Sequence, residues 1–137
     1  MGRFGVCLVT LAVLTGGLYS EPVFADAKQP NSPAMVLSED LTGLYRCEGE
    51  GYRGTVIIRR TGDTYQFLWF IGSDTHMGVG LREGTLISSS WQSAGMSVPG
   101  IVVYQVEKDN KLVGRYSSYP GNGQVGTETL TYIGPAE

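Results

Sequence analysis

The segment Gly54–Ile71, GTVIIRRTGDTYQFLWFI, decides the fold class, because it contains two β-type runs joined by a tight turn. Apolar residues alternate at period two in both runs, which is typical of strands with one buried face. The large residues that share a face within each run are Val56 and Ile58 in the first, and Tyr65, Phe67 and Trp69 in the second. Thr61-Gly62-Asp63 is a turn sequence, so the segment predicts an antiparallel hairpin.

The same unit, about eight β-type residues and then a turn, repeats along the chain. Eight strands are expected, at Leu41–Gly49, Gly54–Arg60, Thr64–Ile71, Thr75–Leu81, Thr85–Trp91, Gly100–Glu107, Lys111–Ser117 and Gly126–Ile133. No segment after residue 25 shows apolar residues at helical spacing over ten positions. Most links are short, so neighbouring strands are expected to pair in sequence order as an all-β, up-and-down antiparallel meander.

A meander of eight strands exposes two edges unless it closes, and closure into a barrel removes them. Glycine is abundant, at 20 of 137 residues against a usual share of roughly 7%. Glycines within the expected strands (Gly54, Gly78, Gly80 and Gly114) suit the sharp coiling of a small barrel, and Gly78-Val79-Gly80 suggests a bulge or bend. We therefore predict a small eight-stranded barrel, and a two-sheet β-sandwich is the alternative. A barrel of this size is either solid or holds one small ligand.

The first 25 residues are typical of a secretory signal peptide. One positive charge at Arg3 precedes an apolar stretch, residues 4–18, that is short for a membrane span, and Val23-Phe24-Ala25 fits a cleavage site before Asp26. A retained membrane anchor is the alternative. Residues 26–40 contain two prolines and no sustained period, which predicts a flexible leader before a single domain at residues 41–134. The mature protein is expected to be exported, either periplasmic or secreted, without a membrane span.

Charge argues against several classes of partner. The net charge is −3, and the basic residues are scattered rather than gathered in a stripe. Nucleic acid is therefore not an expected partner. An anionic membrane surface is not expected either, because no basic amphipathic helix is present.

Catalytic and metal-binding patterns are weak. His76 is the only histidine, and Asp74, its nearest carboxylate in sequence, lies with it beside an expected turn, where both predict solvated side chains rather than a catalytic dyad. One histidine and one mature cysteine cannot complete a tetrahedral zinc site, and no calcium-loop pattern occurs. We predict a protein that is not an enzyme, with no metal and no cofactor.

Cys47 is the only cysteine after residue 25, so no intramolecular disulfide is expected. Alternation places it on the same face as Tyr45, which predicts a buried thiol that packs as a small hydrophobe. An intermolecular disulfide or a redox-active thiol is the alternative.

Aromatic residues are the remaining signal, and they fit two interpretations. The first is that they fill the barrel core. The second is a pocket at the barrel mouth, with tryptophan walls, tyrosine hydroxyls as polar anchors, and inward serine hydroxyls that need a partner. The candidate ligand-binding residues for a hollow barrel are Tyr45, Tyr65, Trp69, Ser88, Ser90, Trp91 and Tyr104.

Several glycine–aromatic blocks resemble a family of small exported bacterial proteins often labelled fibronectin-binding. The blocks are Gly43–Gly49, Tyr52–Val56, Gly62–Trp69, Gly78–Gly80, Val102–Tyr104, Lys111–Gly114 and Gly126–Leu130. The resemblance implies binding to an extracellular matrix protein, and it carries no binding residues with it. The pattern is also broadly similar to avidin-like barrels, and the expected size is that of avidins and lipocalins.

Three functions remain open from the sequence. The first is an exported module that binds a host or envelope protein, fibronectin being the partner implied by the resemblance. The second is a carrier of a small apolar or aromatic ligand inside the barrel. The third is an envelope structural protein or a lysozyme inhibitor; Tyr45-x-Cys47 resembles an element of such inhibitors, whose disulfide needs a second mature cysteine.

Overall fold

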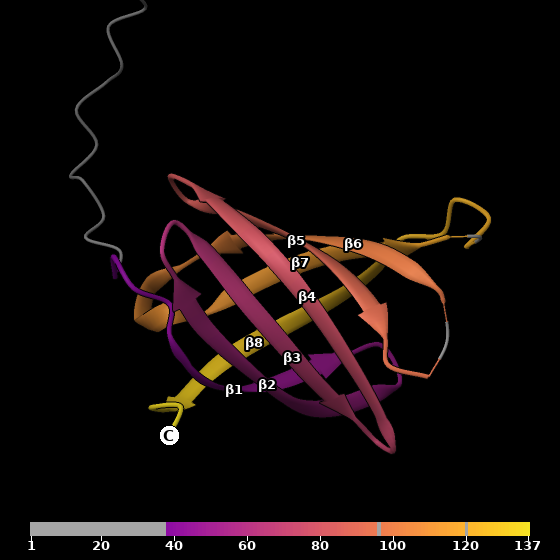
Figure 1. The fold of residues 1–137 in the computed structure, drawn as a ribbon, viewed down its shortest axis with the longest axis horizontal. Coiled ribbons are helices and arrows are strands. Elements are labelled where there is room, and N and C mark those ends of the chain that lie inside the picture. Colours follow the sequence, from indigo (N-terminus) through magenta and orange to yellow (C-terminus); the bar gives the residue numbers. More distant parts are fainter. Residues whose placement is uncertain (1–37, 96, 120) are drawn as a thin grey trace, which may run out of the picture. The chain divides into compact units, whose positions relative to one another are not determined.

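The computed structural model describes residues 38–95, 97–119 and 121–137, and these form a closed β-barrel (Figure 1). Its strands are β1 (Gly43–Gly49), β2 (Tyr52–Thr61), β3 (Thr64–Ile71), β4 (Asp74–Glu83), β5 (Leu86–Ser93), β6 (Pro99–Val106), β7 (Leu112–Ser118) and β8 (Gly126–Gly134). A single 3₁₀ turn, η1 (Lys108–Asn110), joins β6 to β7. Every strand pairs antiparallel with its sequence neighbours, and β1 pairs with β8 to close the sheet. The predicted up-and-down barrel is confirmed over the β-sandwich.

Alternation along the strands sets the core. Inward residues are buried and their neighbours lie in contact with solvent, as β3 shows with Tyr65, Phe67 and Trp69 inside and Gln66 and Phe70 exposed. The fully or nearly fully buried apolar residues are Leu41, Tyr45, Cys47, Val56, Ile58, Tyr65, Phe67, Trp69, Ile87, Val102, Tyr104, Val106, Leu112 and Leu130. The predicted burial of Cys47 beside Tyr45 is confirmed.

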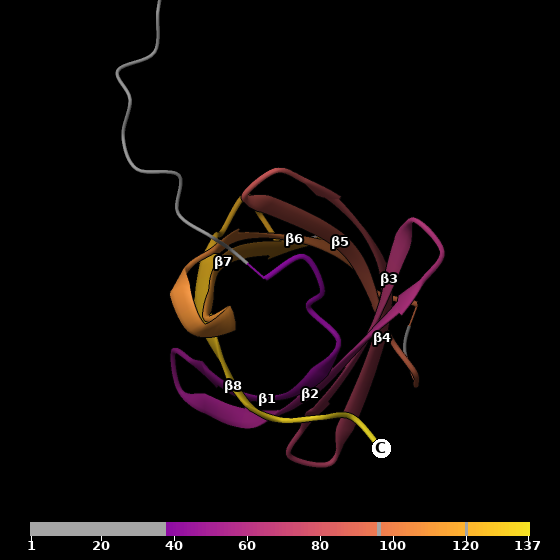
Figure 2. The same cartoon turned by 90° about the vertical axis from the view of Figure 1, so that its left-hand side faces the viewer.

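One end of the barrel is closed by the chain that precedes β1, which crosses the opening in Figure 2. Leu41 is fully buried there, and its carbonyl accepts a 2.8 Å hydrogen bond from the Tyr45 hydroxyl. Arg82 donates to the carbonyl oxygens of Ser38 and Glu39 at 2.8 and 3.2 Å. Residues 38–40 are therefore bound to the barrel, unlike the flexible leader expected from the sequence. The remainder of that leader and the expected signal peptide lie outside the described residues.

Close strand packing explains the glycines within the strands. A Cβ atom at Gly78 would lie 1.9 Å from the Ser90 carbonyl oxygen, and one at Gly54 would lie 2.2 Å from the Phe70 carbonyl oxygen. The β4–β5 pairing is interrupted between Met77 and Gly80 without a change of register, so the bulge suggested there is absent. A register shift occurs instead between Leu44 and Tyr45, on the β1–β8 pairing.

Candidate functional site

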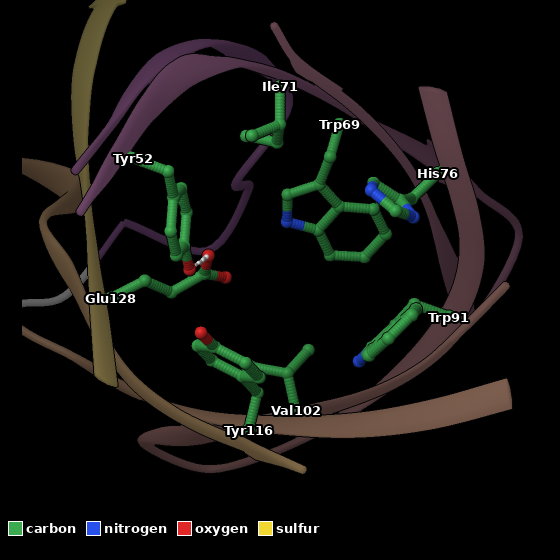
Figure 3. A pocket seen from close by; sticks show the side chains of 8 residues that line it. All are labelled: Tyr52, Trp69, Ile71, His76, Trp91, Val102, Tyr116 and Glu128. Atoms are coloured by element: carbon green, nitrogen blue, oxygen red, sulfur yellow. Dashed lines mark hydrogen bonds between the residues drawn. The ribbon is translucent and has the colours of Figure 1, made fainter. Parts of the chain in front are cut away.

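The barrel contains a cavity of about 240 Å³ at the end opposite Leu41, where the β1–β2, β3–β4, β5–β6 and β7–β8 links lie. The lining side chains come from seven strands, β2 to β8, and Figure 3 shows them gathered around one space. They are Tyr52, Trp69, Ile71, His76, Trp91, Val102, Tyr116 and Glu128. Because these residues alternate with outward-facing neighbours, the cavity is the unfilled end of the barrel interior and continues directly into the core.

Glu128 is the polar centre of this cavity. It occupies an inward position of β8 and is 7% exposed. Its carboxylate accepts hydrogen bonds from the Tyr52 hydroxyl at 2.7 Å, from the Cys47 thiol at 3.3 Å, and from the Tyr104 hydroxyl. The Trp69 indole N–H donates in turn to the Tyr104 oxygen at 3.2 Å. The carboxylate is thus held by three donors in a network that reaches from the core to the cavity wall.

All of these donors are neutral. The ion pairs found among the described residues involve Glu48 and Glu107, on the barrel exterior, and none includes Glu128. A buried carboxylate is costly unless it is hydrogen-bonded and paired with an opposite charge. Within the part of the chain that the structure describes, Glu128 meets the first requirement and not the second.

The donors remain protonated, because their pKa values are raised. Burial raises the pKa of Tyr104 well above its ordinary value, and the negative charge of Glu128 raises it further. Burial and the adjacent Glu128 carboxylate raise the pKa of the Tyr52 hydroxyl and of the Cys47 thiol in the same way. A low thiolate fraction makes Cys47 a poor nucleophile, which disfavours the redox-active alternative.

The free energy of unfolding is expected to fall in alkaline solution. Above pH about 10, the unfolded chain releases the Tyr104 proton while the folded barrel keeps it, because the folded pKa is raised. The stabilisation is therefore fully present below pH 10 and declines above it by about 1.4 kcal/mol per pH unit for this one group. The decline attributable to Cys47 begins near pH 9, its ordinary pKa.

Urea unfolding followed between pH 7 and 11 measures this effect. Tyr104→Phe is expected to make the decline in stability above pH 10 less steep, while the buried hydroxyls of Tyr45 and Tyr52 keep part of it. Cys47→Ala is expected to remove the earlier part of the decline near pH 9. A wild-type stability that stays level up to pH 11 would contradict the raised pKa values.

The aromatic walls of the cavity are fixed by cross-strand glycines. Tyr52 lies opposite Gly49, Trp91 opposite Gly100, and Tyr116 opposite Gly126 in the strand pairings. In each pair the ring covers its glycine so closely that a Cβ atom there would lie 2.1–2.3 Å from a ring atom. Aromatic rings laid over strand glycines are a known packing device of β-sheets. The three glycines allow three rings to lie against the barrel wall, and the centre of the cavity stays empty.

Ring–ring contacts also hold Trp69 and His76 in place at the cavity wall. Trp69 stacks on Phe67 with ring centroids 5.1 Å apart, and Phe67 stacks on Tyr104 at 6.1 Å. His76 meets Trp91 edge to face at 5.4 Å. The His76 Nδ1 atom is buried and has no hydrogen-bond partner among the described residues, so it is an unused polar group at the cavity wall.

The structure divides the aromatic residues predicted for the pocket into three groups. Trp69 and Trp91 line the cavity, as expected for its walls. Tyr104 lies in the core and reaches the site through its hydroxyl. Tyr45 and Tyr65 bond to the segment before β1 at the closed end, so they do not line the cavity.

Ser88 and Ser90 are a correction, because both are exposed on the outer face of β5. The inward residues of that strand are Ile87 and Ser89, followed by Trp91 at the cavity. Because side chains alternate between the two faces of a strand, Trp91 shares a face with Ser89, and Ser88 and Ser90 lie on the opposite face. The buried Ser89 hydroxyl is satisfied by donating to the Ser90 carbonyl at 2.7 Å.

Six lining residues were not identified from the sequence. They are Tyr52, Ile71, His76, Val102, Tyr116 and Glu128. The signal that could have revealed Glu128 is alternation in β8, which puts it on the same face as the buried Leu130. His76 was expected to be solvated beside a turn, but it is half-buried near the start of β4 and lines the cavity.

Neither a metal cluster nor a membrane-spanning helix is found in the described residues. No group of three His, Cys, Asp or Glu side chains within them could hold a metal ion. No helix there is long and apolar enough to cross a bilayer.

Fold and site together define a closed antiparallel β-barrel with an aromatic, carboxylate-centred cavity at one end. No family model matches the chain, and no curated protein matches it. Among solved structures it is similar to the crystal structure of apo lipid binding protein 8 from Caenorhabditis elegans, with 11% sequence identity and a TM-score of 0.48. That alignment covers 72% of this chain and 100% of the other. At this identity and TM-score, the likeness is too weak to assign a ligand or a family.

Proposed function

We propose that the protein binds a small, largely apolar ligand in the cavity of the barrel. One observation supports this most directly: a cavity with fixed aromatic walls surrounds a buried carboxylate that has no cationic partner among the described residues. Small-molecule sites are typically concave and apolar, with a few convergent polar groups that orient the ligand. Glu128 and the unpartnered Nδ1 of His76 are those groups here.

The size of the cavity limits the ligand. Its volume of about 240 Å³ exceeds the roughly 150 Å³ of an engineered protein cavity that holds benzene. It is smaller than the roughly 300–1,000 Å³ of pockets for drug-sized molecules. A single aromatic ring with a short polar substituent therefore matches the space.

Core packing alone does not account for the arrangement at this end of the barrel. A larger side chain at Gly49, Gly100 or Gly126 would fill space that the aromatic rings now occupy. The glycines instead let the rings lie flat against the sheet, which preserves an empty volume beside a buried charge. Empty volume costs packing energy, so its retention beside polar groups favours a binding role.

Tryptophan fluorescence provides a direct assay, because both tryptophans of the chain, Trp69 and Trp91, line the cavity. Titration with small aromatic compounds is expected to give a saturable change in emission. Val102→Phe, which adds a ring inside the cavity, should weaken binding at least about tenfold while the protein remains folded by circular dichroism.

Val103→Phe is the matched control, because Val103 is the next residue of β6 and lies 40% exposed on the outer face. It should bind like the wild type. Equal binding by both folded variants would place the ligand elsewhere than in the cavity. Binding of an extracellular matrix protein remains a prediction of the sequence resemblance alone.

A further inference from the structure

The charge of Glu128 indicates which ligands the cavity selects. Its carboxylate oxygens accept three hydrogen bonds, from Tyr52, Tyr104 and Cys47. An ionised carboxylate offers about four acceptor positions, so one position remains for a further donor. An anionic ligand would be repelled at this position, whereas a cation would supply the opposite charge that the barrel itself does not provide within the described residues.

The aromatic walls favour the same kind of ligand. Four of the eight lining residues present Tyr or Trp rings around the space in front of Glu128, as Figure 3 shows: Tyr52, Trp69, Trp91 and Tyr116. Tyr52 and Tyr116 meet edge to face with ring centroids 6.2 Å apart, beside the carboxylate. The faces of aromatic rings carry partial negative charge and attract cations, and enclosures built from several such rings recognise alkylammonium groups.

We propose that the ligand is a small organic cation whose ammonium group sits against the Glu128 carboxylate within the aromatic enclosure of Tyr52, Trp69, Trp91 and Tyr116. This inference rests on the proposed function and specifies its ligand class. The apolar remainder of the ligand packs between Ile71 and Val102. A neutral hydrogen-bond donor would satisfy the remaining acceptor position of Glu128 without the charge, so the test must separate charge from hydrogen bonding.

Three probes of similar size make that separation at pH 7: phenethylammonium, 2-phenylethanol and phenylacetate. Tryptophan fluorescence is expected to show the ammonium binding at least about tenfold more tightly than the alcohol, because it adds charge pairing and cation–π attraction. Phenylacetate is expected to bind most weakly. This comparison uses the wild-type protein and does not depend on the folding of any variant.

Glu128→Gln tests the residue itself. It should reduce the affinity for phenethylammonium at least about tenfold and change the affinity for 2-phenylethanol by less than about threefold. Glu48→Gln is the matched control, because it removes the same charge from an exposed position on β1. It should leave both affinities unchanged.

The outcomes distinguish the two proposals. If the alcohol binds as tightly as the ammonium, the ligand class is wrong and the small-ligand cavity stands. If phenylacetate binds best, the charge assignment is reversed and the inference is overturned. If none of the three probes binds, the proposed function fails for ligands of this size, and the inference fails with it.

Discussion

Gly78→Ala is expected to lower the free energy of unfolding by at least about 3 kcal/mol, more than most overpacking substitutions cost. The new Cβ atom would lie 1.9 Å from the Ser90 carbonyl oxygen and 2.9 Å from the Ser89 hydroxyl oxygen. The first of these is backbone, so β4 and β5 must separate to admit the methyl group. A domain with a total stability of about 5–15 kcal/mol would lose a large part of it. Urea unfolding followed by tryptophan fluorescence measures the loss.

Gly134→Ala is the control for this substitution. A Cβ atom at Gly134 meets nothing within 4 Å, and its backbone is not in the left-handed region. Its effect should stay within about 0.5 kcal/mol. If Gly78→Ala unfolds at the same urea concentration as the wild type, β4 and β5 do not approach as closely as the structure shows.

The architecture could be predicted because one physical rule governs most of the chain. Period-two alternation and turn glycines located all eight strands to within a few residues at each end. The main departures occur where turn residues join strands. Tyr52 begins β2, and Asp74, Arg82 and Glu83 extend β4, because pairing with a neighbouring strand overrides local turn preference.

The site was less predictable, because its key residues contradict the average behaviour of their types. Glutamate is almost never fully buried unless paired, so the residue type alone gives no reason to place Glu128 inside the barrel. Only the three donors contributed by other strands make its burial tolerable, and pairings between residues as distant as Cys47 and Glu128 are not visible in local sequence. The two tryptophans were identified because large aromatic residues dominate any barrel interior, whether solid or hollow.

The serines of β5 show how strictly parity matters. Ser88, Ser89 and Ser90 are chemically identical, and a displacement of one residue reverses which of them faces the core. The choice is settled by Ile87 and Trp91, which share the parity of Ser89 and occupy the interior. Had parity been counted from these two large residues, the outward positions of Ser88 and Ser90 would have followed from the sequence.

Glu128→Ala is expected to destabilise the barrel by about 3 kcal/mol, because it removes the shared acceptor of three buried donors. The Tyr104 hydroxyl bears most of this cost, since it is fully buried and loses its acceptor, whereas Tyr52 lies partly open to the cavity. Urea unfolding provides the measurement. Glu48→Ala is the control and should cost less than about 1 kcal/mol, because Glu48 makes only exposed ion pairs.

A double-mutant cycle separates the network from the lost side-chain volume. Tyr104→Phe alone leaves Glu128 with one donor fewer and deprives the Trp69 indole of its acceptor. With Glu128→Ala already present, Tyr104→Phe should lower the free energy of unfolding by about 1 kcal/mol or more less than it does in the wild type, because the Tyr104 hydroxyl no longer has a carboxylate to which it can donate. Additive effects would mean that the two groups do not interact. A Glu128→Ala protein as stable as the wild type would mean that the carboxylate contributes nothing to the fold. Its burial would then favour the proposed role of Glu128 in ligand binding.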